Sequence, residues 1–187
     1  MFHIRLARAE DADTLARLER QYLKDELTAG SGEGFQGQAF SRAELGELIQ
    51  NHWLLVAELA GEIVAYVIAG RWQFFETWPI YRALLQRLPR LTADDPALGG
   101  KHGLSRNNTC QYGPVWIKKE CRGQGIFEAL LARLRQEVAP SFPYMLTFIA
   151  EDNQLSYAAH AGKGKMRVLD YFGFAGRDYY LLLSESS

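Results

Sequence analysis

Two apolar runs separated by two residues constrain the fold of this chain more than any other feature. The segments 52–59 and 62–69 are rich in β-branched and aromatic residues, and only Ala60-Gly61 lies between them. A two-residue connection between such runs is typical of a β-hairpin, so we expect an antiparallel strand pair. Strand-like and helical patterns alternate on both sides of this hairpin. The sequence therefore predicts a mixed α/β fold.

The segments before the hairpin predict one strand and two helices. Apolar and charged residues alternate over 2–6, which indicates a half-buried strand. Apolar residues recur at helical spacing over 13–23, and Ser41 with Glu44 forms a capping box that begins a helix over 42–50. The intervening segment 28–40 is rich in glycine, and we interpret it as a loop that closes over a bound molecule.

The segments after the hairpin predict further elements up to the C-terminus. We expect a helix over 78–88 with Pro79 in its first turn and Pro89 ending it, a strand over 109–117, a helix over 124–138, a strand over 144–150, a short helix capped by Asp152 or Asn153 and ending near Gly162, and strands over 168–172 and 178–183. This order predicts one domain over residues 1–187, in which the segment 71–108 is an insertion.

Composition excludes several classes of protein. The 187 residues carry 21 basic and 22 acidic side chains, which disfavours a large surface for nucleic acid or an anionic membrane. No apolar signal segment or spanning segment is present, so we expect a cytoplasmic protein. Cys110 and Cys121 are predicted to be free thiols. His3, His52 and His102 lack metal-ligand spacing, so we expect no metal.

The segment from Val115 to Ile126 carries the clearest chemical signal. It runs from a strand through a basic turn, with glycines at 123 and 125, into a helix. Glycine lets the backbone approach a ligand closely, and the free N–H groups and dipole of a helix start attract anions. This pattern predicts a phosphate site.

Two other phosphate motifs do not fit the sequence. A dinucleotide fingerprint beginning at Gly123 requires glycine at the position of Glu128. The segment Gly162-Lys163-Gly164-Lys165 lacks the upstream glycine and the following Ser or Thr of a nucleotide-binding P-loop, so we interpret it as a solvated basic turn.

Two motifs resemble the GNAT acetyltransferase superfamily. The segment Arg122-Gly123-Gln124-Gly125-Ile126-Phe127 resembles its Arg/Gln-x-x-Gly-x-Gly/Ala motif and departs from it only at Phe127, where the family has a small residue. The segment 150–156 resembles the end of the family's fifth strand, where an Asn and a Ser approach the coenzyme. The resemblance spans 1–70 and 109–187, includes a C-terminal hairpin, and leaves out 28–40 and 71–108.

The resemblance implies a fold and a cosubstrate. The fold is a mixed, mostly antiparallel central sheet flanked by helices, with a helical insertion between the third and fourth strands. The cosubstrate is acetyl-CoA. The implied contacts are the backbone of Val115, Trp116 and Ile117 along its pantetheine arm, the turn formed by Arg122, Gly123, Gln124, Gly125, Ile126 and Phe127 at its pyrophosphate, and Asn153 and Ser156 nearby.

The resemblance also implies a general acid. Seven residues after Asn153, many family members carry a tyrosine that protonates the departing thiolate, and His160 stands at that position here. His160 therefore inherits the role, while a histidine that packs near a helix end is the structural alternative. A backbone N–H of Val115 or Trp116 is expected to polarise the thioester carbonyl.

The general base is not identified by the sequence. Gln111 and Tyr112 on the fourth strand are not carboxylates, and Glu151 is equally consistent with a solvated strand end.

Three hypotheses follow for function and assembly. The first is an N-acetyltransferase that moves an acetyl group from acetyl-CoA directly to a primary amine of a small molecule or protein. The alternative is a catalytically silent acyl-CoA-binding sensor or assembly module. The third, compatible with both, is a homodimer formed through the insertion. The aromatic residues of the insertion fit either a core or dimer surface or an acceptor wall; they are Trp72, Phe74, Phe75, Trp78 and Tyr81.

Overall fold

The chain is built around a seven-stranded sheet. In the computed structural model, residues 1–22, 40–94, 98 and 103–187 are described. The strand order is β1-β2-β3-β4-β5-β7-β6, and every neighbouring pair is antiparallel except β4 and β5. The strands are β1 (His3–Leu6), β2 (Trp53–Leu59), β3 (Glu62–Gly70), β4 (Thr109–Ile117), β5 (Tyr144–Ala150), β6 (Arg167–Phe174) and β7 (Arg177–Glu185). This mostly antiparallel sheet confirms the expected fold class.

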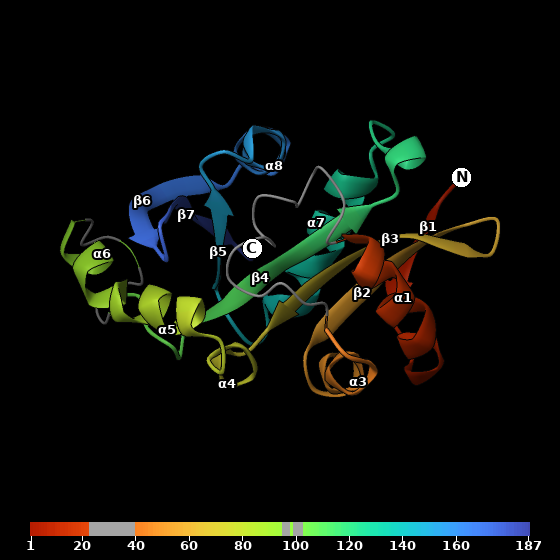
Figure 1. The fold of residues 1–187 in the computed structure, drawn as a ribbon, viewed down its shortest axis with the longest axis horizontal. Helices are drawn as coiled ribbons and strands as arrows, with labels where there is room; N and C mark the ends of the chain where they lie inside the picture. The colour runs from red at the N-terminus through yellow and green to blue at the C-terminus, as the bar shows by residue number, and fades with distance from the viewer. Residues whose placement is uncertain (23–39, 95–97, 99–102) are drawn as a thin grey trace.

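Helices cover both faces of the sheet. The α-helices are α1 (Ala12–Tyr22), α3 (Arg42–Asn51), α4 (Trp72–Phe75), α5 (Pro79–Gln86), α6 (Leu88–Asp94), α7 (Ile126–Val138) and α8 (Gln154–Ala158). Single turns of 3-10 helix occur at Ala9–Asp11 and Lys119–Cys121, and a π-helical turn at Ala159–Lys163. The apolar residues of α7 form one core beneath the sheet, while those of α1, α3, α4 and α5 form a second core on the other face. Figure 1 shows this layering around the long strands β2 to β4.

Local signals in the sequence account for most element boundaries. The turn residues Ala60 and Gly61 both have positive φ, 53° and 80°, as a two-residue hairpin turn requires. The capping box is formed, because the Ser41 side chain accepts from the Glu44 N–H and the Glu44 carboxylate accepts from the Ser41 N–H. The glycine-rich segment 28–40 lies outside the described residues apart from Phe40.

The predicted helix over 78–88 corresponds to α5, which ends at Gln86 before Pro89, and a further helix, α6, was not predicted. Pro89 is the second residue of α6, which follows α5 after one residue. Proline lacks only an N–H that the first turn of a helix leaves unpaired, so it fits the start of a new helix here.

The described part of the insertion 71–108 is packed into the core. Trp72 and Phe75 are buried beside the sheet, and the indole N–H of Trp72 donates to Oγ1 of Thr109 on β4 at 3.0 Å. Farther along, the Tyr81 ring lies 5.3 Å from that of Phe148 on β5. Beyond α5, Arg87 bonds Asp170 on β6 at 2.8 Å. The insertion therefore runs from the β3–β4 side of the sheet to the β5–β6 side.

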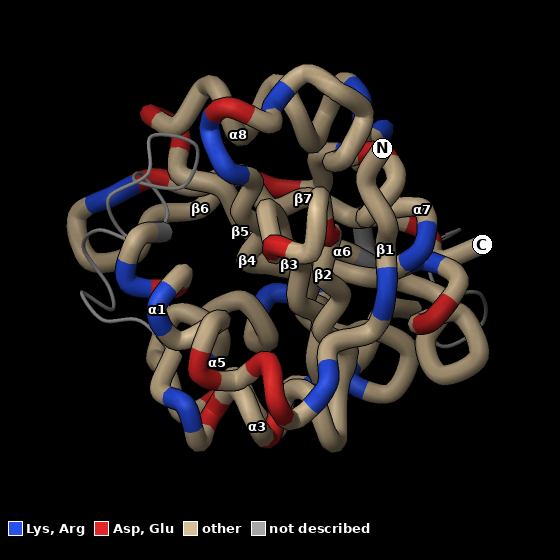
Figure 2. Tube along the Cα trace, turned by 90° about the vertical axis from the view of Figure 1, so that its right-hand side faces the viewer, with Lys and Arg blue, Asp and Glu red and all other residues tan. Residues whose placement is uncertain are grey.

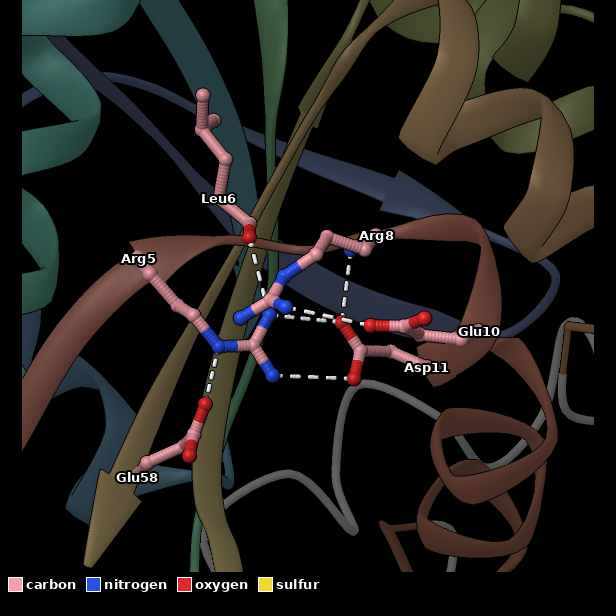
Figure 3. Close-up of polar contacts among 6 residues, drawn as sticks. All are labelled: Arg5, Leu6, Arg8, Glu10, Asp11 and Glu58. Carbon is pink, nitrogen blue, oxygen red and sulfur yellow. Dashed lines mark hydrogen bonds and ion pairs between the residues drawn. The ribbon is translucent and has the colours of Figure 1, made fainter. Parts of the chain in front are cut away.

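An ion-pair network joins the first strand to the second. Figure 3 shows the Arg5 guanidinium between two carboxylates, with Asp11 bonded at 2.8 and 3.0 Å and Glu58 on its other side. Asp11 also accepts the N–H of Arg8 at 2.7 Å, and the bond to Arg5 lowers the pKa of Asp11. These contacts fix β1, at the edge of the sheet, and its following turn. Elsewhere, Figure 2 shows basic and acidic residues interspersed over most elements.

Candidate cofactor and acyl-transfer site

A V-shaped opening lies between β4 and β5. Their parallel pairing comprises Thr109 with Tyr144, Cys110 with Met145, and Gln111 with Leu146, and it extends no farther. Figure 1 shows the two strands side by side at their starts and diverging toward their ends. Parallel strands that separate in this way direct backbone N–H and C=O groups into the space between them.

A bulge on β4 determines which backbone groups face this opening. Against β3, the register shifts by one residue between the pair of Ala69 with Tyr112 and the pair of Val67 with Val115. Beyond the shift, the Lys118 N–H donates to the Val64 carbonyl at 2.8 Å. Hydrogen-bonded positions alternate along an antiparallel pair. The backbone of Trp116 therefore faces β3, while the N–H and C=O of Val115 and Ile117 face the opening.

The turn after β4 leads into the start of α7. Gly125 is the N-cap residue of α7 and has φ 86°, a left-handed conformation that glycine adopts without strain. A Cβ atom at Gly125 or at Gly123 would meet no atom within 4 Å. No side chain caps this helix, so its first N–H groups are presented to an external partner.

A pocket of about 310 Å³ lies at this turn. Six residues predicted from the sequence to bind the cofactor line it: Ile117, Arg122, Gly123, Gly125, Ile126 and Phe127. Arg122 and Lys163 contribute positive charge to the lining, and Glu128 contributes one negative charge. A cationic turn beside a helix start fits the phosphates of a coenzyme.

The sequence patterns did not predict that α8 and the following π-helical turn line this pocket. Leu155, Ala158 and Ala159 line its far side from α8 and the π-helical turn, and Lys163 comes from the segment interpreted as a solvated basic turn. The order of the strands could have predicted this contribution. Because α8 follows β5, which pairs with β4, the two turns beyond these strands lie near each other.

The remaining predicted cofactor residues lie outside the lining of this pocket. The side chain of Gln124 donates to the Glu120 carbonyl at the surface. Trp116 packs against Tyr66 on the opposite face of the sheet, with 5.9 Å between ring centroids. Asn153 caps α8 by accepting from the Ser156 N–H at 3.2 Å, and both residues are buried.

His160 is buried within a hydrogen-bonded chain. Its Nδ1 lies 2.8 Å from the Ser156 carbonyl, so it carries the proton and donates it. Its Nε2 therefore accepts from the Tyr112 hydroxyl at 3.0 Å. The Phe127 ring contacts the imidazole edge-on at 5.1 Å, so the residue that departs from the GNAT-like motif packs against His160. Tyr112, which the sequence analysis set aside, is thus the proton-bearing partner of His160.

Burial lowers the pKa of His160 from 6.5 to about 4, with only its bond to the Ser156 carbonyl opposing the shift. The imidazole is neutral at pH 7, and its one proton is held by a carbonyl. This geometry favours a positioning role for His160 toward Tyr112 over direct protonation of a thiolate.

This burial predicts acid-sensitive stability. A histidine whose folded pKa is depressed stabilises the protein fully above its unfolded pKa, and that contribution is lost as the pH falls through the folded value. We expect the free energy of unfolding to fall by about 3 kcal/mol between pH 7 and pH 4 because of His160 alone. Urea denaturation at several pH values measures this change in the free energy of unfolding.

The His160→Phe variant is the control for this dependence of the free energy of unfolding on pH. The pKa of His52 is also lowered by burial, but His52 remains in both proteins, so the difference between them isolates His160. Parallel pH profiles for the two proteins would contradict the expectation.

Two carboxylates are candidate bases, one after β5 and one on α1. Glu151, after β5, is exposed and accepts from the Tyr171 hydroxyl. Glu19 of α1 is buried on the face opposite α7, where it accepts from the Tyr66 hydroxyl at 2.5 Å and the Phe40 N–H at 3.0 Å. Burial raises the pKa of Glu19. The sequence analysis missed Glu19, although its spacing next to the apolar stripe of α1 was the available signal.

Comparison with known proteins shows which solved structures share this fold. No family model matches the sequence, and no curated protein is detectably similar to it. Three similar solved structures have TM-scores of 0.65, 0.64 and 0.63. The first is an acetyltransferase of the GNAT family from Streptococcus pneumoniae, 16% identical over 99% of both chains. The second is a ribosomal-protein-alanine N-acetyltransferase from Brucella melitensis, 18% identical over 98% of this chain and 99% of that one. The third is yncA from Salmonella typhimurium, described as an acetyltransferase with its cofactor acetyl-CoA, 17% identical over 100% of this chain and 94% of that one.

The chain has the fold of the GNAT acetyltransferases, as the two sequence motifs predict. Within the described residues, no helix is long and apolar enough to span a bilayer. In the same part of the chain, no three His, Cys, Asp or Glu side chains gather as metal ligands.

Proposed function

We propose that the protein is an acetyl-CoA-dependent N-acetyltransferase acting on a primary amine. The observation that carries the proposal is the pocket at Gly125, which begins at Ile117, the last residue of β4, and is lined by the start of α7 and by α8. The uncapped start of α7, with the side chains of Arg122 and Lys163, fits the phosphates of the coenzyme. Open space at the Cβ positions of Gly123 and Gly125 lets those phosphates approach the backbone.

In this proposal acetyl-CoA supplies an acetyl group activated by a thiol leaving group. The Val115 N–H, which faces the opening, donates to the carbonyl oxygen as negative charge develops there. Tyr112, whose hydroxyl is held by His160, is the candidate proton-bearing group on the α7 face. The amine loses its proton to water or to a carboxylate on the opposite face of the sheet.

One observation favours the alternative of a silent acyl-CoA-binding module. His160 is neutral at pH 7 and both of its ring nitrogens are engaged. A chain that holds the coenzyme without a competent proton donor binds acetyl-CoA but does not turn it over.

Thiol release from acetyl-CoA, followed by absorbance, tests the proposal. The acceptor panel contains phenethylamine, spermidine, lysine methyl ester and alanyl-glycine, which cover aryl, polycationic, side-chain-like and N-terminal amines. Thiol release that depends on the addition of at least one of these amines supports the transferase. Silence with all four, together with a melting temperature that acetyl-CoA raises, supports the binding module.

A further inference from the structure

The residue at the base of the opening has no role in the function described so far. Gln111 forms the last parallel pair with Leu146, and the strands part immediately after it. Its side chain is only 2% exposed. It alternates with Cys110 and Tyr112, which pack under α7, so it lies on the opposite face of the sheet.

The amide of Gln111 is only half satisfied. Its Nε2 donates to the Tyr112 carbonyl at 2.7 Å, but its Oε1 has no hydrogen-bond partner among the described residues and is buried. A buried acceptor without a donor destabilises a fold, and native proteins keep few of them. The buried polar side chains of Asn153 and His160, by contrast, are bonded. The position of Gln111 Oε1 suits a donor that arrives with a ligand.

We propose that Gln111 Oε1 accepts a hydrogen bond from the attacking amine of the acceptor. The assignment rests on the acyl-transfer function proposed above. Gly70 lies directly opposite Gln111 on β3, and the Phe75 ring and the His52 imidazole pack over it, 2.8 and 3.3 Å from where a Cβ would stand. Burial lowers the pKa of His52 and so favours its neutral form. An uncharged carbonyl beside an aromatic ring suits a neutral amine, because burial disfavours the ammonium form. The neutral amine is also the form that carries the nucleophilic lone pair.

The contact is strongest in the transition state. As the nitrogen attacks the acetyl carbon, a C–N bond forms and the C–S bond breaks. One proton leaves the nitrogen for water, and the sulfur takes one proton. While the C–N bond forms, the nitrogen becomes positive and its N–H becomes a better donor to Gln111. Gln111 therefore lowers the barrier as well as positioning the acceptor.

The Gln111→Met variant tests this assignment, because methionine is of similar size and removes the amide. We expect kcat/KM for the most active amine of the panel to fall roughly ten- to a hundredfold. The rise in melting temperature caused by acetyl-CoA is expected to stay unchanged. The substitution removes the orphaned oxygen but also the bond from Nε2 to the Tyr112 carbonyl, and these effects oppose each other, so the melting temperature of the free variant is expected to stay close to that of the wild type. A residue with a purely structural role would instead lower it.

Ser186→Ala is the matched control. The Ser186 hydroxyl is likewise buried without a partner among the described residues, but its backbone joins Pro143 at the closed end of β5. We expect its melting temperature to respond as that of Gln111→Met does, with kcat/KM unchanged. Gln111→Asn, which withdraws the oxygen by one bond, is expected to lower kcat/KM as well and serves if the Met variant does not fold.

The outcomes separate the two levels of the proposal. Wild-type kcat/KM in both Gln111 variants of an active enzyme overturns the role of Gln111 alone, as does an equal loss in Ser186→Ala. A wild-type protein that binds acetyl-CoA but releases no thiol with any of the four amines overturns the transferase and the role of Gln111 with it.

Discussion

Replacing Gly125 by aspartate is expected to weaken acetyl-CoA binding roughly a hundredfold. Gly125 is the N-cap residue of α7, where no side chain caps the first N–H groups of the helix, and it lines the pocket together with Arg122 and Lys163. A carboxylate there faces the coenzyme phosphates at short range, where like charges repel by a few kcal/mol. The change in melting temperature with acetyl-CoA concentration measures the affinity.

Gly125→Asn is the matched control. Asparagine has the shape of aspartate and tolerates the left-handed conformation that φ 86° requires, and open space surrounds its Cβ. The Asn variant therefore carries the backbone strain without the charge. Equal affinities of the Asp and Asn variants for acetyl-CoA would contradict the placement of the coenzyme phosphates at this turn.

Replacing Trp72 by alanine is expected to lower the free energy of unfolding by about 4 kcal/mol. Trp72 is 2% exposed, and its N–H donates to Thr109 on β4. The change removes a large buried ring and leaves the Thr109 hydroxyl without that donor. Urea denaturation of both proteins gives the difference.

The Trp72→Phe variant distinguishes the contribution of the buried ring to stability from that of the hydrogen bond. It keeps most of the apolar contact and loses the N–H, so a loss of about 1 kcal/mol is expected. If Trp72→Ala cost no more than a surface substitution, the insertion would be peripheral to the core rather than part of it.

Local patterns predicted most of the fold. The limits of β4 and β5 match the predicted segments 109–117 and 144–150, because apolar runs bounded by turn residues are typical of buried strands. The Ser41 capping box and the Ala60-Gly61 turn likewise act through neighbours in the chain. The helix α6 was not predicted because Pro89 fits the end of one helix as well as the start of the next.

The candidate site was less predictable from the sequence, because it depends on contacts between distant segments. The glycines of the turn predict a phosphate site from the local sequence alone. Lys163, Glu19 and the pairing of Tyr112 with His160 depend on how β4, β5 and α1 are arranged in space, which no local pattern encodes. The orphaned oxygen of Gln111 is visible only after every neighbour has been placed.

The sheet consists of two antiparallel halves, β1 to β4 and β5 to β7, that meet along only three residue pairs. The chain passes from one half to the other through α7, which connects β4 to β5. The insertion gives the halves a second connection, through Tyr81 to Phe148 and Arg87 to Asp170. These two contacts brace the halves against each other across the space between β4 and β5, so the described part of the insertion limits how far the halves can move apart.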